Sequence, residues 1–330
     1  MHGAPTRRGT VRDFGRKVFS SSAATILSRL TGFVREVLLV ALIGPSRLTD
    51  IFYFVYALPN MIRRVLGEGA LVSAFLPAFT KIERENGTEA ATDFASRVLY
   101  WQGVATGGFA LLITLVLSAV WLLSEPGSYA GVYAEYGLVL APYAFVICAV
   151  ALLGAILNSR GIFFIPLSVQ TVMNMVWIVV VLAVAFTIGP RHGLTLVGAG
   201  VVIACGLAVW YMARLAAAKG VTVRWTRGGG LTPEFRSFLG KFMLTLVGVA
   251  SYPINLFADR LMAEFVVLRE GAVTFLYQGD RLMQVPLGVI GLSIGSVALA
   301  ALSAAAADHR RFHVLFSKTM TLAKIGRAHV

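Results

Sequence analysis

The sequence predicts an all-α protein, a polytopic bundle of membrane-spanning helices. Hydrophobic residues make up 57% of the 330 residues and charged residues only 14%, and the mean hydropathy is +0.77. A soluble domain of this length does not have that composition. The apolar residues gather into stretches of about 20 or more, the length that a helix needs to cross a bilayer. We predict eight spans, with a ninth beginning after His313, at residues 19–43, 51–80, 97–123, 134–157, 164–188, 193–218, 236–267 and 271–304.

The first span contains two arginines, Arg29 and Arg35. An arginine at the centre of a membrane helix costs about 2.5 to 3.5 kcal/mol, so its side chain must face a protein interior or an aqueous cavity. Gly32 and Arg35 share one helix face, on which no carboxylate lies within a turn. Arg29 and Glu36 are seven residues apart and share another face. A structural ion-pair network therefore stays open as the alternative role of Arg29.

The second span combines a proline with two further arginines. Pro59 removes a backbone donor and predicts a kink. Arg63 follows Asp50 by thirteen residues, about 20 Å along a helix, so it cannot simply reach the outer surface. Arg64 and Glu68 are four residues apart and can pair, which makes Arg64 as much a structural as a functional candidate. Arg63 has no such partner in sequence and is the better ligand candidate.

The later spans contain two adjacent acid–base pairs, Asp259 with Arg260 and Asp280 with Arg281. Neighbouring residues on a helix point in different directions, so we expect each member to find its partner on another helix or on a ligand. For Asp280 the alternative is a salt bridge between the halves of the bundle, with no ligand role. Several guanidinium groups at membrane depth suit an anionic, phosphate-bearing ligand.

The distribution of basic residues predicts the orientation. Seventeen lysines and arginines fall in the segments that would be cytoplasmic if the amino terminus is cytoplasmic, whereas the opposite segments hold only Arg47, Arg191 and Arg269. This asymmetry predicts an amino terminus inside the cell. Orientation and attraction to membrane lipids account for the net charge of +13, so we expect no nucleic acid partner.

No enzyme signature is present. The sequence has no Walker A or H-E-x-x-H pattern, and its histidines lie outside the spans, so we expect a transporter rather than an enzyme. Cys148 and Cys205 lie in different spans and are expected to be small core residues. We expect no cofactor, although a sodium or other ion gradient could drive transport.

The segments SRLTGFVRE, LPNMIRRVLGEGA, LLGAILNSRGIFFIP and YQGDRLMQVPLGVIG resemble, in wording and order, the MurJ (MviN) family of lipid II flippases. This resemblance implies the multidrug/oligosaccharidyl-lipid/polysaccharide exporter superfamily, whose members have two lobes around a cationic cavity. It implies that the chain flips the undecaprenyl-pyrophosphate-linked peptidoglycan precursor, lipid II, from the inner to the outer leaflet of the bacterial cytoplasmic membrane by alternating access.

The resemblance also implies a division into domains. We expect a cytoplasmic tail at 1–18, a complete six-helix first lobe at 19–218, a cytoplasmic linker at 219–235 and a partial second lobe at 236–323. Residues 324–330, KIGRAHV, resemble translated sequencing adapter, so we expect a non-native tail on a truncated chain.

The family's cavity arginines match Arg29, Arg35, Arg63 and Arg281, and the acidic residue at the start of its second span matches Asp50. Glu36 stands where the family usually has aspartate. The implied gating or ion-pair residues are Asp50, Glu36, Arg64, Glu68 and Asp280, and the implied sodium ligands are Asn255 and Asp259.

Lipid II, membrane lipids and proteins of cell-wall synthesis or division are the expected partners. The alternative is a related exporter of another polyprenyl-linked saccharide or of drugs. A membrane scaffold or receptor would not explain arginines at mid-membrane depth.

Overall fold

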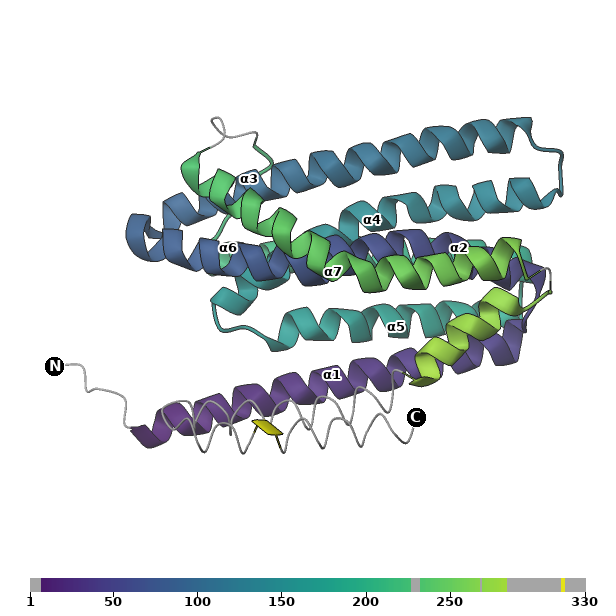
Figure 1. The fold of residues 1–330 in the computed structure, drawn as a ribbon. Helices are drawn as coiled ribbons and strands as arrows, with labels where there is room; N and C mark the ends of the chain where they lie inside the picture. Colours follow the sequence, from purple (N-terminus) through teal and green to yellow (C-terminus); the bar gives the residue numbers. More distant parts are fainter. Residues whose placement is uncertain (1–6, 227–231, 268, 284–315, 318–330) are drawn as a thin grey trace. The chain divides into compact units, whose positions relative to one another are not determined.

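The computed structural model describes residues 7–226, 232–267, 269–283, 316 and 317, and all of its regular structure in this part of the chain is helical, as predicted (Figure 1). The helices are, in order, α1 (Arg7–Ile43), α2 (Arg47–Ile62), the π-helix η1 (Arg63–Leu71), α3 (Val72–Leu123), α4 (Tyr129–Ser159), α5 (Phe164–Ala185), α6 (Pro190–Ala218) and α7 (Pro233–Phe265). Helical residues resume at 272–283.

The first connection shows how the sequence ends one helix and starts the next. Gly44 adopts a φ of 82°, a left-handed conformation that glycine reaches without strain. Ser46 then caps α2: its hydroxyl accepts from the Thr49 amide, and the Thr49 hydroxyl accepts from the Ser46 amide. This capping box fixes the entry of the chain into α2.

The predicted second span is divided into three helical segments. Pro59 lies inside α2, and the hydrogen-bond pattern changes to that of a π-helix four residues later, at Arg63. Because Pro59 cannot donate to the carbonyl one turn before it, the helix is locally free to widen. Single π-turns are frequent at functional sites, and here the π segment carries Arg63 and Arg64.

The helix α3 is much longer than a membrane span because it continues through the predicted loop at residues 81–96. Within it, Gly87 has φ 88° and ψ 172°, so the 52 residues form two helices joined at a sharp bend. The residues that follow Gly87 lead into the predicted third span, which is one of five described helices, α3 to α7, that are long and apolar enough to cross a membrane. The predicted tail, residues 1–18, is also helical from Arg7 onward.

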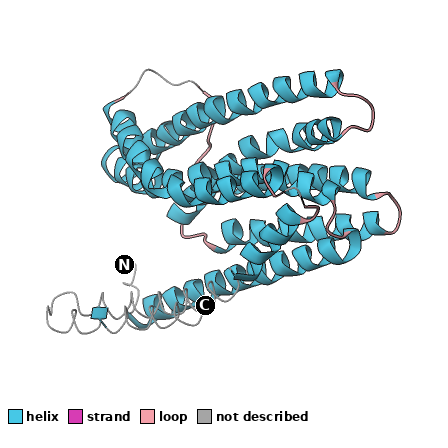
Figure 2. Ribbon diagram, turned by 45° about the vertical axis from the view of Figure 1, so that its right-hand side comes forward, coloured by secondary structure: helices cyan, strands magenta, loops and turns pink. Residues whose placement is uncertain are grey.

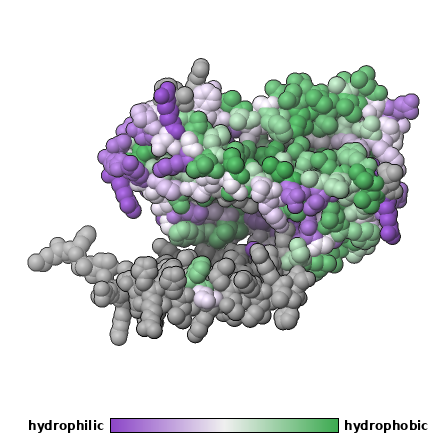
Figure 3. All heavy atoms as spheres, in the orientation of Figure 1, coloured by the Kyte–Doolittle hydropathy of each residue, from purple (hydrophilic) through white to green (hydrophobic). Residues whose placement is uncertain are grey.

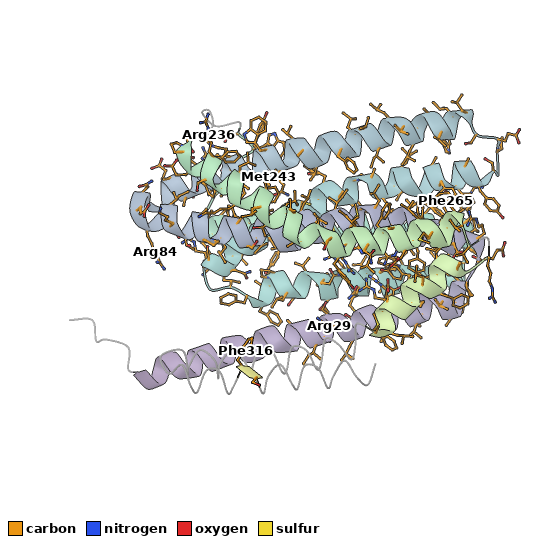
Figure 4. The ribbon with its side chains drawn as sticks, viewed as in Figure 1. Arg29, Arg84, Arg236, Met243, Phe265 and Phe316 are labelled. Carbon is orange, nitrogen blue, oxygen red and sulfur yellow. The ribbon has the colours of Figure 1, made fainter. Side chains whose placement is uncertain are left out.

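The connections lie at two opposite ends of the bundle (Figures 1 and 2). Those after α1, α3 and α5 lie at one end, and the Gly87 bend and the connections after α4 and α6 lie at the other. Arg84 and Arg236 mark this second end and Phe265 the first (Figure 4). The described basic residues around the Gly87 bend and in the connections after α4 and α6 therefore share one end. Hydrophobic side chains cover the length of the helices, and hydrophilic residues gather toward the two ends (Figure 3).

The chain divides into two compact units, residues 1–276 and 277–330. Within the first unit α1 packs on α5, α4 packs on α3 and α6, and α7 packs on α2, η1 and α3. The predicted linker, 219–235, begins where α6 ends, at Ala218, but its last three residues already belong to α7, which Thr232 caps. The eighth predicted span is described only to residue 283, the start of the ninth only at residues 316 and 317, and the tail at 324–330 lies outside the described residues.

Candidate functional site

A cavity of about 490 Å³ lies among α1, η1, α3, α4 and α5. Its charged lining residue is Arg63, and its other polar side chains are Ser28, Asn158 and Gln170. Among the described residues no aspartate or glutamate lines it; the described lining residues are Ser28, Arg63, Val72, Ile147, Val150, Ala151, Gly154, Ala155, Asn158, Phe163, Pro166, Leu167, Val169, Gln170 and Met173. The cavity is therefore cationic.

Arg63 is positioned by the residue one turn before it. Its Nε donates to Asn60 Oδ1 at 3.0 Å, and Asn60 is buried. This contact uses one of the five N–H donors of the guanidinium and orients its plane. Asn60 was not among the residues selected from the sequence, although it stands in the LPNMIRR segment.

Arg35 lies outside this cavity, in a buried polar network between α1, α2 and α5. Its guanidinium forms an ion pair with Glu36 and donates to Asn174 Oδ1 at 3.0 Å. Its Cζ atom lies 4.0 Å from the centre of the Trp177 ring, a cation–π distance. Tyr53 Oη donates to the second Glu36 oxygen at 2.7 Å.

The helix face of Arg35 carries no carboxylate within a turn, but the next residue, Glu36, still forms an ion pair with it. Arg35 and Glu36 are adjacent, but two long side chains can converge when a neighbouring helix covers them both. Asn174 completes the contact between helices, since its Nδ2 donates to Ser28 O at 3.0 Å. A Cβ added at Gly32 would lie 3.3 Å from that amide, so glycine permits the close approach of α1 and α5.

The other arginines selected from the first two spans are only partly buried. Arg29 lies on α1 (Figure 4) and is not among the cavity-lining residues. Arg64 belongs to η1, immediately after Arg63. The side chain of Glu68 lies outside the described part of the structure, so its pairing with Arg64 stays a prediction.

Asp50 acts as a helix cap. It is 1% exposed, and its oxygens accept from the Gly271 amide at 2.7 Å, the Thr274 amide at 2.8 Å and the Thr274 hydroxyl at 2.6 Å. Gly271 and Thr274 lie at the start of the helix at 272–283. The Asp50 carboxylate therefore accepts from amides at the amino terminus of that helix, where a negative charge also interacts favourably with the helix dipole.

We predict that Asp50→Ala releases the start of this helix. Losing a capping side chain costs about 0.5 to 2 kcal/mol, so the Gly271 and Thr274 amides should exchange with deuterium severalfold faster. Asp50→Asn should retain part of the protection because its carbonyl can still accept. Asp93→Ala, which removes an exposed acid on α3, is the control. Equal exchange in Asp50→Ala and the unmodified chain would show that the cap is dispensable.

The two acid–base pairs of the later spans are placed in different units. Arg260 is buried, whereas Asp259 and Asn255 are exposed on α7. Within the described residues no group of three His, Cys, Asp or Glu side chains could hold a metal ion, so the sodium assignment stays a prediction.

Arg281 belongs to the second unit, where it donates to Tyr277 Oη at 2.9 Å. The roles of Arg281 and Asp280 also remain predictions.

A second cavity, of about 410 Å³, lies among α2, α3, α4 and α7. It includes Ile62, the residue before Arg63. Its described lining contains no charged residue and only one hydroxyl, that of Tyr133. This cavity is therefore not a candidate for an anionic group.

Ion pairs at the two ends of the bundle were missed because their members are far apart in sequence. Arg47 pairs with Glu264 at 2.7 Å and Arg191 pairs with Glu135 at 2.9 Å; these residues lie near the connections after α1 and α5. At the other end Arg160 pairs with Glu83 at 2.5 Å.

The comparison with known families decides the relationship of this chain. The family model described as lipid II flippase MurJ matches residues 39–324. The chain belongs to the MurJ family. It is 31% identical over 296 residues to the protein named "Probable lipid II flippase MurJ" from Vibrio cholerae, an alignment that covers 86% of this chain and 55% of that protein. The protein named "Lipid II flippase MurJ" from Burkholderia cenocepacia is 26% identical over 303 residues, covering 89% of this chain and 58% of the relative.

A solved MurJ structure supports the fold independently. The structure titled "Lipid II flippase MurJ, inward closed conformation" matches with a TM-score of 0.70 and 23% identity, covering 91% of this chain and 61% of that one. The all-α MurJ fold and a multi-pass membrane protein are thereby confirmed. The chain spans about half the length of the curated MurJ relatives that it matches.

Proposed function

We propose that this MurJ-family chain contributes the substrate-binding half of a carrier that flips lipid II by alternating access. The observation that carries the proposal is the cavity that Arg63 lines together with Ser28, Asn158 and Gln170, with no carboxylate among its described lining residues. A guanidinium can meet two phosphate oxygens at once, which suits a diphosphate group. Arg29, Arg35 and Arg281 are proposed to contribute positive charge to the transport path in other conformations.

The second candidate is an exporter of another polyprenyl-linked saccharide, which would share this chemistry. Export of cationic drugs is disfavoured, because the described lining of the cavity offers them an arginine and no carboxylate. We propose transport driven by an ion gradient or the membrane potential; moving one charge through 100 mV is worth about 2.3 kcal/mol.

The test of the proposed function is complementation. The complete gene should support growth of a bacterium depleted of its own lipid II flippase, and the encoded protein should move labelled lipid II across vesicle membranes. Growth failure together with absent lipid II movement, at normal protein levels, would contradict the proposal. Movement of a different polyprenyl-linked saccharide alone would favour the second candidate.

We propose a location in the bacterial cytoplasmic membrane with the amino terminus inside, which predicts a labelling pattern. In intact cells an impermeant maleimide should label Glu125→Cys, in the connection after α3, and should not label Thr226→Cys, in the connection after α6. Both positions are exposed, and the native Cys148 and Cys205 are buried. Labelling of Thr226→Cys in sealed cells, without labelling of Glu125→Cys, would show that the protein has the opposite orientation.

A further inference from the structure

The cationic cavity contains more hydrogen-bonding chemistry than a diphosphate needs. Beside Arg63 it presents two amide side chains, Asn158 and Gln170, and the hydroxyl of Ser28. These come from η1, α4, α5 and α1, so four separate helices bring polar groups to one apolar-walled space. Polar side chains on the wall of an apolar cavity are costly unless they find partners, which makes them candidates for ligand contacts.

Asn158 is the clearest case. It lies in the last turn of α4, is half-buried, and its side chain makes no hydrogen bond within the part of the chain that the structure describes. The two residues that follow it use their side chains elsewhere, because Ser159 Oγ donates to Ile156 O at 2.6 Å and Arg160 pairs with Glu83. Helix capping and surface pairing therefore do not account for an amide at this position.

The side-chain amide of Gln170 uses only part of its hydrogen-bonding capacity within the protein. Its Nε2 donates to Asn174 Oδ1 at 3.4 Å, a long contact that ties it to the network around Arg35. The remaining N–H and the carbonyl oxygen of Gln170 have no hydrogen bond among the described residues. An amide offers two donors and an acceptor with two lone pairs, so most of its capacity is available to a molecule in the cavity.

We propose that Asn158 and Gln170 recognise the saccharide next to the diphosphate of the transported lipid. The inference rests on the proposed function and adds a specificity-determining role for two residues. Phosphate oxygens only accept hydrogen bonds, and Arg63 supplies donors for them. Amide side chains both donate and accept, which matches the hydroxyl and amide groups of a glycan. A site that hydrogen-bonds such groups rejects a ligand that lacks them, because its own polar groups are then left unpaired.

The test compares two lipids that differ only beyond the diphosphate. Binding of undecaprenyl diphosphate and of lipid II is measured with the 330-residue chain in nanodiscs. We expect the unmodified chain to bind lipid II more tightly. Asn158→Leu and Gln170→Leu should each weaken lipid II binding about tenfold, the effect of losing one or two neutral hydrogen bonds, and leave undecaprenyl diphosphate binding within about twofold.

The controls separate this inference from the proposed function. Gln102→Leu removes a half-buried amide of α3 that does not line the cavity and should change neither affinity. Arg63→Ala should weaken the binding of both lipids. Asn158→Ser and Gln170→Ser provide smaller polar replacements if the leucine variants fail to fold, and should show the same selective loss.

Three outcomes would overturn the inference. If the variant that combines Asn158→Leu with Gln170→Leu still prefers lipid II to the same degree, the two amides do not contact the saccharide. The proposed function would then remain intact. Equal loss for both lipids would show that the amides only shape the phosphate site. No binding of either lipid to the unmodified chain, or no effect of Arg63→Ala, would remove the proposed function itself.

Discussion

Arg63→Ala is expected to abolish lipid II flipping and to weaken lipid II binding by about tenfold to a hundredfold. The physical reason is that charge-assisted hydrogen bonds contribute about 1.5 to 3 kcal/mol each, and Arg63 is the charged residue among those that line the cavity. Arg63→Lys keeps the charge but loses the planar donor pair, so its affinity should fall between those of alanine and arginine.

The measurements are lipid II binding and flipping by the complete protein at matched expression. Arg84→Ala removes an arginine that is exposed at the end of the bundle (Figure 4) and should leave both unchanged. A lysine variant that binds as tightly as the unmodified protein would contradict the bidentate contact and leave a nonspecific cationic cavity. An alanine variant that complements normally would exclude Arg63 from the transport path.

Arg35→Met is expected to have the largest effect on stability. It would remove the guanidinium beside Glu36, whose side chain is 0% exposed, and breaking a buried ion pair from one side costs about 3 to 5 kcal/mol. Glu36→Gln should cost less, because the guanidinium keeps the Asn174 oxygen and the Trp177 ring. The double variant, Arg35→Met with Glu36→Gln, should recover much of the lost stability, because both charges of the ion pair are then removed.

Thermal unfolding of the purified variants in mild detergent tests this order. If the double variant is no more stable than Arg35→Met, the ion pair is not the source of the effect. Flipping by the stable double variant then addresses function. Activity comparable to that of the unmodified protein would make Arg35 purely structural, and a folded but inactive double variant would support a role of Arg35 in transport.

The predicted spans and their direction follow from the sequence. Hydrophobic stretches of membrane length and the clustering of lysine and arginine are local properties of the chain, and a bilayer converts them directly into helices with an orientation. The helices α4 to α7 accordingly lie close to the predicted ranges. The resemblance to the MurJ family was also evident from four short segments, and the comparison confirms it.

Arg63 could be singled out from sequence because the evidence for it is local. It lies far from Asp50 along one helix, without an acid one turn away, and these distances depend only on helix geometry. The bend at Gly87 was not predicted, because the charged residues around it are equally compatible with a loop and with two exposed helix ends.

The sequence by itself determined a helical, multi-pass MurJ-family chain with arginines inside its predicted spans. Only the tertiary structure decided which of these arginines faces the cavity and which one is buried in a polar network. The physical reason is the range of the contacts: Arg35 meets Asn174 139 residues away, and Asp50 meets Thr274 224 residues away. The periodicity of one helix fixes the direction of a side chain, but the helix packed against it decides whether that side chain meets a carboxylate, an amide or a cavity.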